Sequence, residues 1–260
     1  MKTRASIRLQ RTLTLACRAG LAAVLMMAVA QPVWAGNGKG ANPGVIPPQA
    51  LPNGMTYGQW GAEWWKWVYA TPVDQNPIQD PDGRFGSQGQ SGQVWFLAGT
   101  FGETVVRSMT IPVGKKIFFP LVNYFNDYPC PDPNFQPAPG QTLEQFLTEG
   151  AGWWLAHVTN MTVTVDGESL GNLFNYRGTS SLTTFVGDPS WVAMDPCVTG
   201  EPQVGVSDGY WIMLAPLPPG QHTIRFTATQ YFPAGIFFPD KDYLWNLDVT
   251  YHVTVKQPAK

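Results

Sequence analysis

Short runs of alternating apolar and polar residues constrain the fold of this chain more than any other feature. In the last run, LDVTYHVTV, apolar side chains occupy every second position from Leu247 to Val255. Successive side chains of a strand point to opposite faces of a sheet, so this spacing predicts a strand with one buried face. Similar runs occur from Val94 onward: VWFLAGT, VVRSMTI, KKIFFPLVNYF, MTVTVDG and GYWIMLAPLPPGQHTIRFTATQYF.

Turn-forming residues separate these runs throughout the chain. The 260 residues include 27 Gly and 24 Pro, and Asp166-Gly167 and Leu217-Pro218-Pro219-Gly220 have hairpin-turn chemistry. Many short strands with frequent turns are typical of an antiparallel two-sheet sandwich, immunoglobulin-like or jelly-roll-like. We therefore expect a mainly β protein with a single domain over residues 54–260, preceded by a flexible leader over residues 36–53.

Two helices are expected to pack on this sandwich. The first, Trp-rich helix lies in GQWGAEWWKWVYATP, where Thr56 and Gln59 can form a capping box and Pro72 ends the helix near Ala70. The second begins after Thr142, which is again followed three residues later by a glutamine. Both predictions rest on local capping chemistry.

The Trp-rich helix has one broad aromatic face. At 100° per residue, Trp60, Trp64 and Trp67 lie on the same side, which predicts a buried stripe. Trp65 and Tyr69 lie on the shoulder of that stripe. There they could pack against a loop or stack on a sugar or another flat ligand, and both alternatives remain open at this point.

The first 35 residues have the pattern of an export signal. Basic residues precede an apolar run from Leu21 to Ala30, and Val33-Trp34-Ala35 resembles a cleavage site. We expect cleavage near Ala35 and a periplasmic or secreted protein. Two cysteines, Cys130 and Cys197, remain after cleavage, and an oxidising compartment favours a disulfide between them.

The charge of the mature chain limits its partners. Removing residues 1–35 leaves 11 basic and 18 acidic residues, a net charge of −7. An acidic protein is a poor partner for nucleic acid or for an anionic membrane, so we expect neither. No second apolar run approaches the length of a membrane span. The sequence gives no indication of the oligomeric state.

Several phrases together carry a family resemblance. GQSGQVWFLAGTFG, IPVGKKIFFPLVNYF, SDGYWIMLAPLPPGQHTIRF and LDVTYHVTV resemble a family of exported bacterial β-sandwich-like proteins known chiefly as uncharacterised. The resemblance covers most of residues 58–255 and transfers no catalytic or binding residue. It implies a further cysteine pair near the positions of Gly86 and Met109, which this chain lacks.

An acidic loop, VDQNPIQDPDGRFG, contains the hard oxygen ligands that calcium prefers. Its candidates are Asp74, Asn76, Asp80 and Asp82. They do not fit the spacing of an EF-hand, and Asp-Pro-Asp-Gly also forms an ordinary turn. Calcium at a non-standard site is therefore an alternative to a purely structural loop, and no other cofactor is predicted.

The sequence offers only weak candidates for catalysis. His157 shares a helix face with Trp154, and Arg177 and Asp208 are further polar candidates. Gly205-Val206-Ser207-Asp208-Gly209 matches the serine-hydrolase pattern, but a strand follows it where that pattern requires a helix.

These observations favour a binding protein over an enzyme. We expect an exported sandwich that binds a glycan, a cell-envelope component or a protein partner through its rim loops, residues 73–93, 126–140 and 187–208. Trp65, Tyr69 and Trp153 are the candidate ligand contacts. One alternative is an extracellular hydrolase or lyase that acts on a polymer with loop carboxylates. The other is a structural or assembly subunit.

Overall fold

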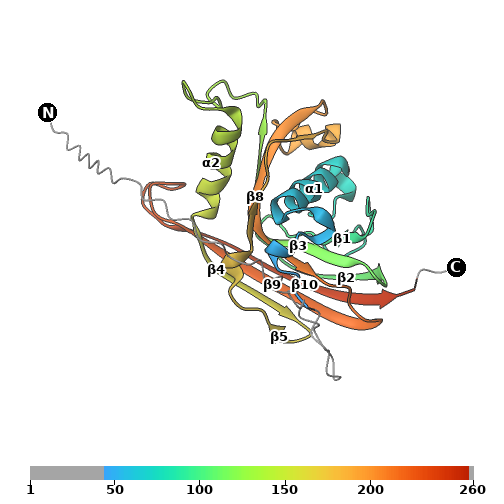
Figure 1. Cartoon of the computed structure of the whole chain (residues 1–260). Coiled ribbons are helices and arrows are strands. Elements are labelled where there is room, and N and C mark those ends of the chain that lie inside the picture. The colour runs from blue at the N-terminus through green and yellow to red at the C-terminus, as the bar shows by residue number, and fades with distance from the viewer. Residues whose placement is uncertain (1–43, 258–260) are drawn as a thin grey trace, which may run out of the picture. The chain divides into compact units, whose positions relative to one another are not determined.

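The computed structural model describes residues 44–257, which form two packed sheets and two main helices (Figure 1). Sheet A contains β1 (Val94–Phe96), β3 (Lys116–Tyr128), β8 (Gln203–Leu214), β6 (Arg177–Thr179) and β7 (Thr183–Phe185). Sheet B contains β2 (Thr104–Pro112), β10 (Tyr243–Lys256), β9 (Gly220–Phe232), β4 (Val158–Val165) and β5 (Glu168–Ser169). The predicted sandwich with two helices is confirmed.

Both sheets are mixed, whereas the sequence predicted antiparallel pairing alone. β1 pairs with β3 and β2 pairs with β10 in parallel, while the other paired strands are antiparallel. The reason is that each parallel pair joins strands that are not connected by a hairpin. β2 lies between β1 and β3 in the chain, and the seven strands β3 to β9 lie between β2 and β10. Local turn signals predict only the hairpin pairs.

The helices and short turns have the following bounds. The main helices are α1 (Tyr57–Ala70) and α2 (Leu143–Leu155), and the 3₁₀ helices are Pro48–Ala50, Pro52–Gly54, Val73–Gln75, Leu173–Tyr176 and Pro189–Ala193. Thr56 and Thr142 form the predicted capping boxes with Gln59 and Gln145. α1 and α2 lie on opposite sides of β8 (Figure 1).

Two apolar cores result from this layering. The sandwich core lies between the two sheets and includes the alternating residues of β10, from Leu247 to Val255, which are buried as predicted. The helix core lies between α1 and sheet A and includes Trp64, Trp67 and Trp211. Sheet A is thus covered on both faces, which explains why nearly every residue of β8 is buried.

Two glycines let α1 approach sheet A closely. A Cβ at Gly58 would overlap the carbonyl group of Thr179, and a Cβ at Gly61 would lie 2.6 Å from the ring of Trp211. Such distances are far below van der Waals contact, so larger residues at these positions would push the helix away from the sheet. The close approach brings the tryptophans of α1 onto β3 and β8.

Part of the predicted leader belongs to the folded domain. Val45 forms a β-bridge with Leu214, and the amide of Ile46 donates a hydrogen bond to the carbonyl of Met213 at 2.8 Å. Backbone pairing to the end of β8 therefore fixes the course of residues 44–46. The predicted export signal, residues 1–35, and residues 36–43 lie outside the described part of the chain.

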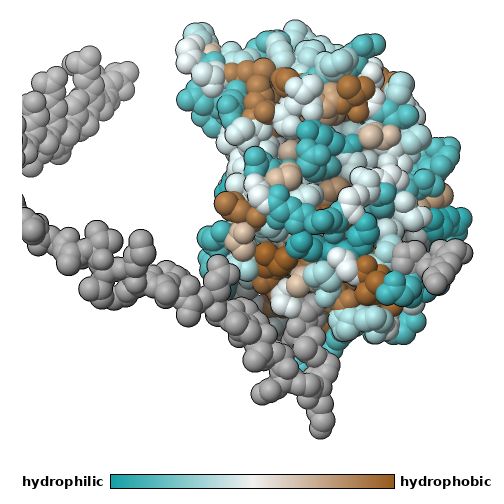
Figure 2. All heavy atoms as spheres, turned by 45° about the vertical axis from the view of Figure 1, so that its right-hand side comes forward, coloured by the Kyte–Doolittle hydropathy of each residue, from teal (hydrophilic) through white to brown (hydrophobic). Residues whose placement is uncertain are grey.

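The disulfide between Cys130 and Cys197 is present as predicted. The positions of the second cysteine pair implied by the family resemblance, Gly86 and Met109, are neighbours in space, since a Cβ on Gly86 would overlap the Met109 side chain. Of the helices in residues 44–257, none combines the length and apolar character needed to cross a bilayer. The face drawn in Figure 2 carries separate apolar patches among polar residues.

Candidate functional site

A cavity of about 450 Å³ lies where residues of α1, β3 and β10 meet. This volume lies within the usual range for small-molecule sites. Aromatic side chains dominate its wall: Trp64, Trp65, Tyr69, Phe101, Tyr124, Phe125, Trp191 and Trp245. The polar side chains of the lining are Thr100, Asn123 and Asp195.

α1 supplies two of the predicted ligand contacts to this wall. Trp65 and Tyr69 are one helical turn apart, and their rings stack with centroids 5.2 Å apart. The exposed fractions are 8% for Trp65 and 4% for Tyr69, so neither forms an exposed platform. Phe125 of β3 packs against both rings. The structure thus brings the two shoulder residues together inside a cavity rather than on the surface.

Two lining residues carry buried hydrogen-bond donors that have no partner in the described part of the chain. They are Nε1 of Trp65 and Nδ2 of Asn123. In contrast, Nε1 of neighbouring Trp64 donates to the carbonyl of Leu97 at 2.9 Å. Buried polar groups in folded proteins nearly always have a partner, and an unsatisfied one costs about 1–3 kcal/mol. An acceptor that reached either donor would therefore be stabilising.

Asn123 owes its position to an irregularity in β3. The pairing of β3 with β8 shifts register between Pro120 and Val122, and these residues also line the cavity. Bulges of this kind redirect side chains and are common beside binding sites. Asn123 follows the shift directly. The lone amide in the apolar run FFPLVNYF was the sequence signal that could have identified it.

Two carboxylates stand at one end of the cavity. Asp195 belongs to the lining, and Asp127 of β3 is buried nearby. Burial and, to a lesser extent, the charge of Asp195 raise the pKa of Asp127 to about 7. Burial and the same two carboxylates raise the pKa of Tyr69 well above its usual value. Nε2 of Gln203 lies 3.5 Å from Oδ2 of Asp127.

The loop that closes this end of the cavity is attached at several points. Asp188 donates its amide hydrogen to the carbonyl of Tyr69 at 2.7 Å, and Nε1 of Trp191 donates to the carbonyl of Thr71 at 3.0 Å. The disulfide joins Cys197 of the same loop to Cys130, just beyond β3. The loop contributes Trp191, Met194 and Asp195 to the cavity wall. Sequence reasoning missed Trp191, because its role depends on these long-range attachments.

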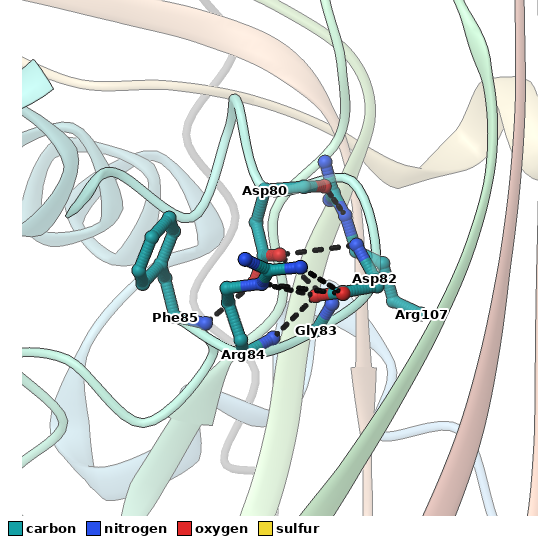
Figure 3. A network of polar contacts seen from close by, with 6 residues as sticks. All are labelled: Asp80, Asp82, Gly83, Arg84, Phe85 and Arg107. Carbon is teal, nitrogen blue, oxygen red and sulfur yellow. Dashed lines mark hydrogen bonds and ion pairs between the residues drawn. The ribbon is translucent and has the colours of Figure 1, made fainter. Parts of the chain in front are cut away.

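Buried Arg107 fixes another part of the wall (Figure 3). Its guanidinium group donates to the carbonyls of Ile78 at 3.2 Å, Asp80 at 2.6 Å and Gly99 at 2.9 Å. Ile78 and Gly99 both line the cavity. Arg107 of β2 therefore joins two separate loops, one with Ile78 and one with Gly99, that both form part of the cavity wall. The isolated arginine of the run VVRSMTI gave no hint of this role.

The predicted calcium ligands are used within the protein. The carboxylate of Asp80 accepts amide hydrogens from Gly83 at 2.8 Å and Phe85 at 2.7 Å, and the carboxylate of Asp82 pairs with Arg84 (Figure 3). The pairing with Arg84 lowers the pKa of Asp82 to about 2. Asn76 binds the carbonyls of Val68 and Thr71, and Asp74 is exposed.

The side chains of Asn76, Asp80 and Asp82 are thus engaged by hydrogen bonds within the protein. Across residues 44–257, no group of three or more His, Cys, Asp or Glu is placed to hold a metal ion.

The weak catalytic candidates occupy two places. Arg177 forms a two-pronged ion pair with buried Asp208, at 3.1 and 2.6 Å, and Thr179 donates a further hydrogen bond to that carboxylate. This pairing raises the pKa of Arg177 further. His157 instead follows α2, where its ring stacks on Phe232 at 4.5 Å. None of the three lines the cavity.

Trp153, the third predicted ligand contact, is exposed near the end of α2. It lies 4.6 Å from the ring of His157 and outside the cavity lining. The structure therefore separates the three predicted ligand contacts into a buried pair and an exposed one.

Comparisons with known proteins add little to this geometry. No protein-family model and no curated protein matches the sequence. The structure of PbICP-C in complex with falcipain-2 is similar at 12% identity and a TM-score of 0.21, over 64% of this chain and 100% of that one. The solution structure of amebosin is similar at 12% identity and a TM-score of 0.15, over 60% and 98%. Likenesses at this level carry no argument about fold or function.

Proposed function

We propose that this protein is an exported binding protein that holds part of a glycan in the cavity beside α1. One observation carries the proposal: two residues of an aromatic-walled cavity, Trp65 and Asn123, have buried N–H donors that no group among residues 44–257 satisfies. A ligand that supplies acceptors to these donors would remove the cost of leaving them unpaired.

Saccharide chemistry matches the aromatic rings, the N–H donors and the carboxylate of the cavity wall. The C–H faces of a sugar ring pack on aromatic rings, which supply most of the wall. Hydroxyl oxygens can accept hydrogen bonds from Trp65 and Asn123, and hydroxyl hydrogens can be donated to the carboxylate of Asp195. No Lys or Arg is found among the lining residues of the described chain, which favours a neutral sugar over an acidic one.

A hydrolase is the second candidate, and the carboxylate pair is the observation that favours it. Asp127, with its pKa raised to about 7, has the protonation behaviour of a general acid, and Asp195 lies close enough to influence it. Asp127 is buried and is not part of the lining, however, so only Asp195 is placed to touch a ligand. Binding without cleavage is therefore the better-supported function.

Calorimetric titration with neutral oligosaccharides tests the binding proposal. Gluco-, xylo- and chito-oligosaccharides are titrated into the purified protein, and bound sugars are then recovered and checked for cleavage. We expect binding of at least one series and recovery of intact sugar. Cleavage that is lost in Asp195→Asn would instead support the hydrolase.

A matched pair of variants shows whether the cavity is the site. Trp65→Phe removes an unpaired buried N–H inside the cavity, and Trp95→Phe removes an equally unpaired N–H in the sandwich core, outside the cavity. We expect the first to weaken saccharide binding by about fivefold to tenfold and the second to leave it unchanged. Equal effects of the two variants would contradict a role for the cavity.

A further inference from the structure

We propose that the cavity is one end of a longer aromatic track, and that the ligand is therefore a chain of several sugar units rather than a single one. This inference rests on the proposed function. It adds a second contact surface, formed at the tip of the β9–β10 hairpin by Phe237, Phe238 and Tyr243 and called the tip surface below.

The first wall of the track follows β10 out of the cavity. Leu247 and Trp245 line the cavity, and Tyr243 is the next residue on the same face of this strand. One step of two residues spans about 7 Å. Tyr243 is 38% exposed, so the wall passes without interruption from the enclosed cavity to the surface.

The second wall runs through α2. Tyr124 lines the cavity and stacks on Trp154, with ring centroids 5.1 Å apart. Trp154 in turn stacks on Phe237, at 5.8 Å. Phe237 also packs edge to face on Tyr243, at 5.4 Å. Both walls therefore end at the same aromatic cluster on the tip.

The tip surface is open rather than covered by the rest of the described chain. Phe237 and Phe238 are exposed, and Trp153 extends the surface along α2. In Figure 1 the β9–β10 connection projects past the sheets beside the lower end of α2. Exposed aromatic clusters of this kind mark interaction sites in soluble proteins.

Continuity with the cavity identifies the occupant of the tip surface. Aromatic rings continue from Trp245 and Tyr124 toward the tip, so a ligand that extends from the cavity in that direction meets further ring faces. The same ring chemistry lines both parts of the track, so repeated units of one polymer fit better than two different partners. Lys241, whose Nζ lies 4.3 Å from the ring centre of Phe238, and Asp240 add polar groups at the outer end for sugar hydroxyls.

Chain-length dependence of binding tests the track. A disaccharide and a hexasaccharide from each of the gluco-, xylo- and chito-oligosaccharide series are titrated into the purified protein. We expect the hexasaccharide of the binding series to bind about tenfold more tightly than the disaccharide. We expect Tyr243→Ala to abolish that gain while leaving disaccharide affinity unchanged, because the cavity lining stays intact.

Leu244→Ala is the matched control. Leu244 is the next residue of β10, is 57% exposed and points to the opposite face of the strand, so both affinities should remain those of the unmodified protein. Equal affinity of short and long sugars would overturn the track and leave the proposed function standing. Absence of binding to all saccharides would overturn both. Sedimentation with phosphatidylcholine vesicles that Tyr243→Ala prevents would also overturn the track, since the tip would then be a membrane contact.

Discussion

Between the two sheets the core is mostly aliphatic, whereas between α1 and sheet A it is mostly aromatic and borders the cavity. Nine of the 15 buried residues of the helix core are aromatic, against five of 24 in the sandwich core. Small branched side chains on facing strands interdigitate closely. Large rigid rings that meet at edge-to-face angles, as Trp64 and Trp65 do, leave larger gaps between them.

The two cores also differ in how their polar groups are satisfied. Three of the four buried unpaired donors of the described residues lie at the interface of α1 with sheet A: those of Trp65, Asn123 and Ser207. The fourth, on Trp95, is in the sandwich core. The helix core therefore carries more unsatisfied polar groups than the sandwich core, which fits the proposed binding role of the cavity beside it.

The largest expected effect is the loss of an aromatic ring from the sandwich core. Phe226 is fully buried and stacks on Phe119 at 5.0 Å. We expect Phe226→Ala to lower the free energy of unfolding by about 4 to 5 kcal/mol, because the rigid surroundings cannot close over the void. Phe125→Ala in the cavity wall should cost about 2 kcal/mol, since space already exists beside that ring.

Urea unfolding of both variants measures this difference. Val106→Ala is the control, because the side chain of Val106 is largely exposed on β2 and its truncation should change stability by less than about 0.5 kcal/mol. Equal losses for Phe226→Ala and Phe125→Ala would mean that the two cores are packed alike.

The disulfide gives the next largest effect, and it also attaches the loop that carries Trp191 and Asp195 to the chain just beyond β3. Cys130 and Cys197 are separated by 67 residues, and a loop of this length contributes about 4 kcal/mol in the chain-entropy model. We expect the double variant Cys130→Ser/Cys197→Ser to lose about this amount in urea unfolding. Saccharide affinity should also fall, because the freed loop carries Trp191 and Asp195. Unchanged affinity would show that the other attachments of the loop are sufficient.

How much of this organisation the sequence predicted depends on the range of the interactions. The capping boxes at Thr56 and Thr142 and the alternation in β10 are local, and each was predicted correctly. The disulfide was predicted from the two cysteines that remain after the expected cleavage near Ala35. The parallel pairing of β2 with β10 was missed, because no local signal specifies contacts between strands so far apart in sequence.

In the candidate site, too, local features were predicted from the sequence and long-range contacts were not. Helical periodicity placed Trp65 and Tyr69 beside each other on α1, and this much is local. The enclosing wall comes from β3, from the loop that carries Trp191 and from β10, so no periodicity could reveal it. Asn123 points toward the cavity side only because the register of β3 shifts just before it. A one-residue shift of this kind leaves no pattern in the sequence.

The prediction of intermediate size concerns Asp127, whose protonation should make the stability of the protein depend on pH. The pKa of Asp127 is raised to about 7 from a usual value near 3.9, so the folded protein binds this proton more tightly than the unfolded chain. Stability should therefore fall as pH rises from about 4 to about 7, on the order of 4 kcal/mol, and level off above that range.

Urea unfolding at a series of pH values checks the slope. Asp127→Asn cannot titrate and should flatten it, whereas Asp74→Asn, which alters an exposed carboxylate, should leave it as it is. A slope that survives in Asp127→Asn would assign the effect to another group.

The smallest expected effect comes from the most closely matched pair of changes in the helix core. Trp64→Phe removes a donor that binds the carbonyl of Leu97 and should cost about 2 kcal/mol, since it leaves a buried acceptor without that bond. Trp65→Phe makes the same change one residue later but removes a donor without a partner, which offsets the loss of ring contacts. We expect a change below about 1 kcal/mol in urea unfolding, together with weaker saccharide binding. An equal loss of stability in Trp65→Phe and Trp64→Phe would mean that Trp65 is an ordinary core residue. The proposed contrast between the sandwich core and the helix core would then be wrong at Trp65.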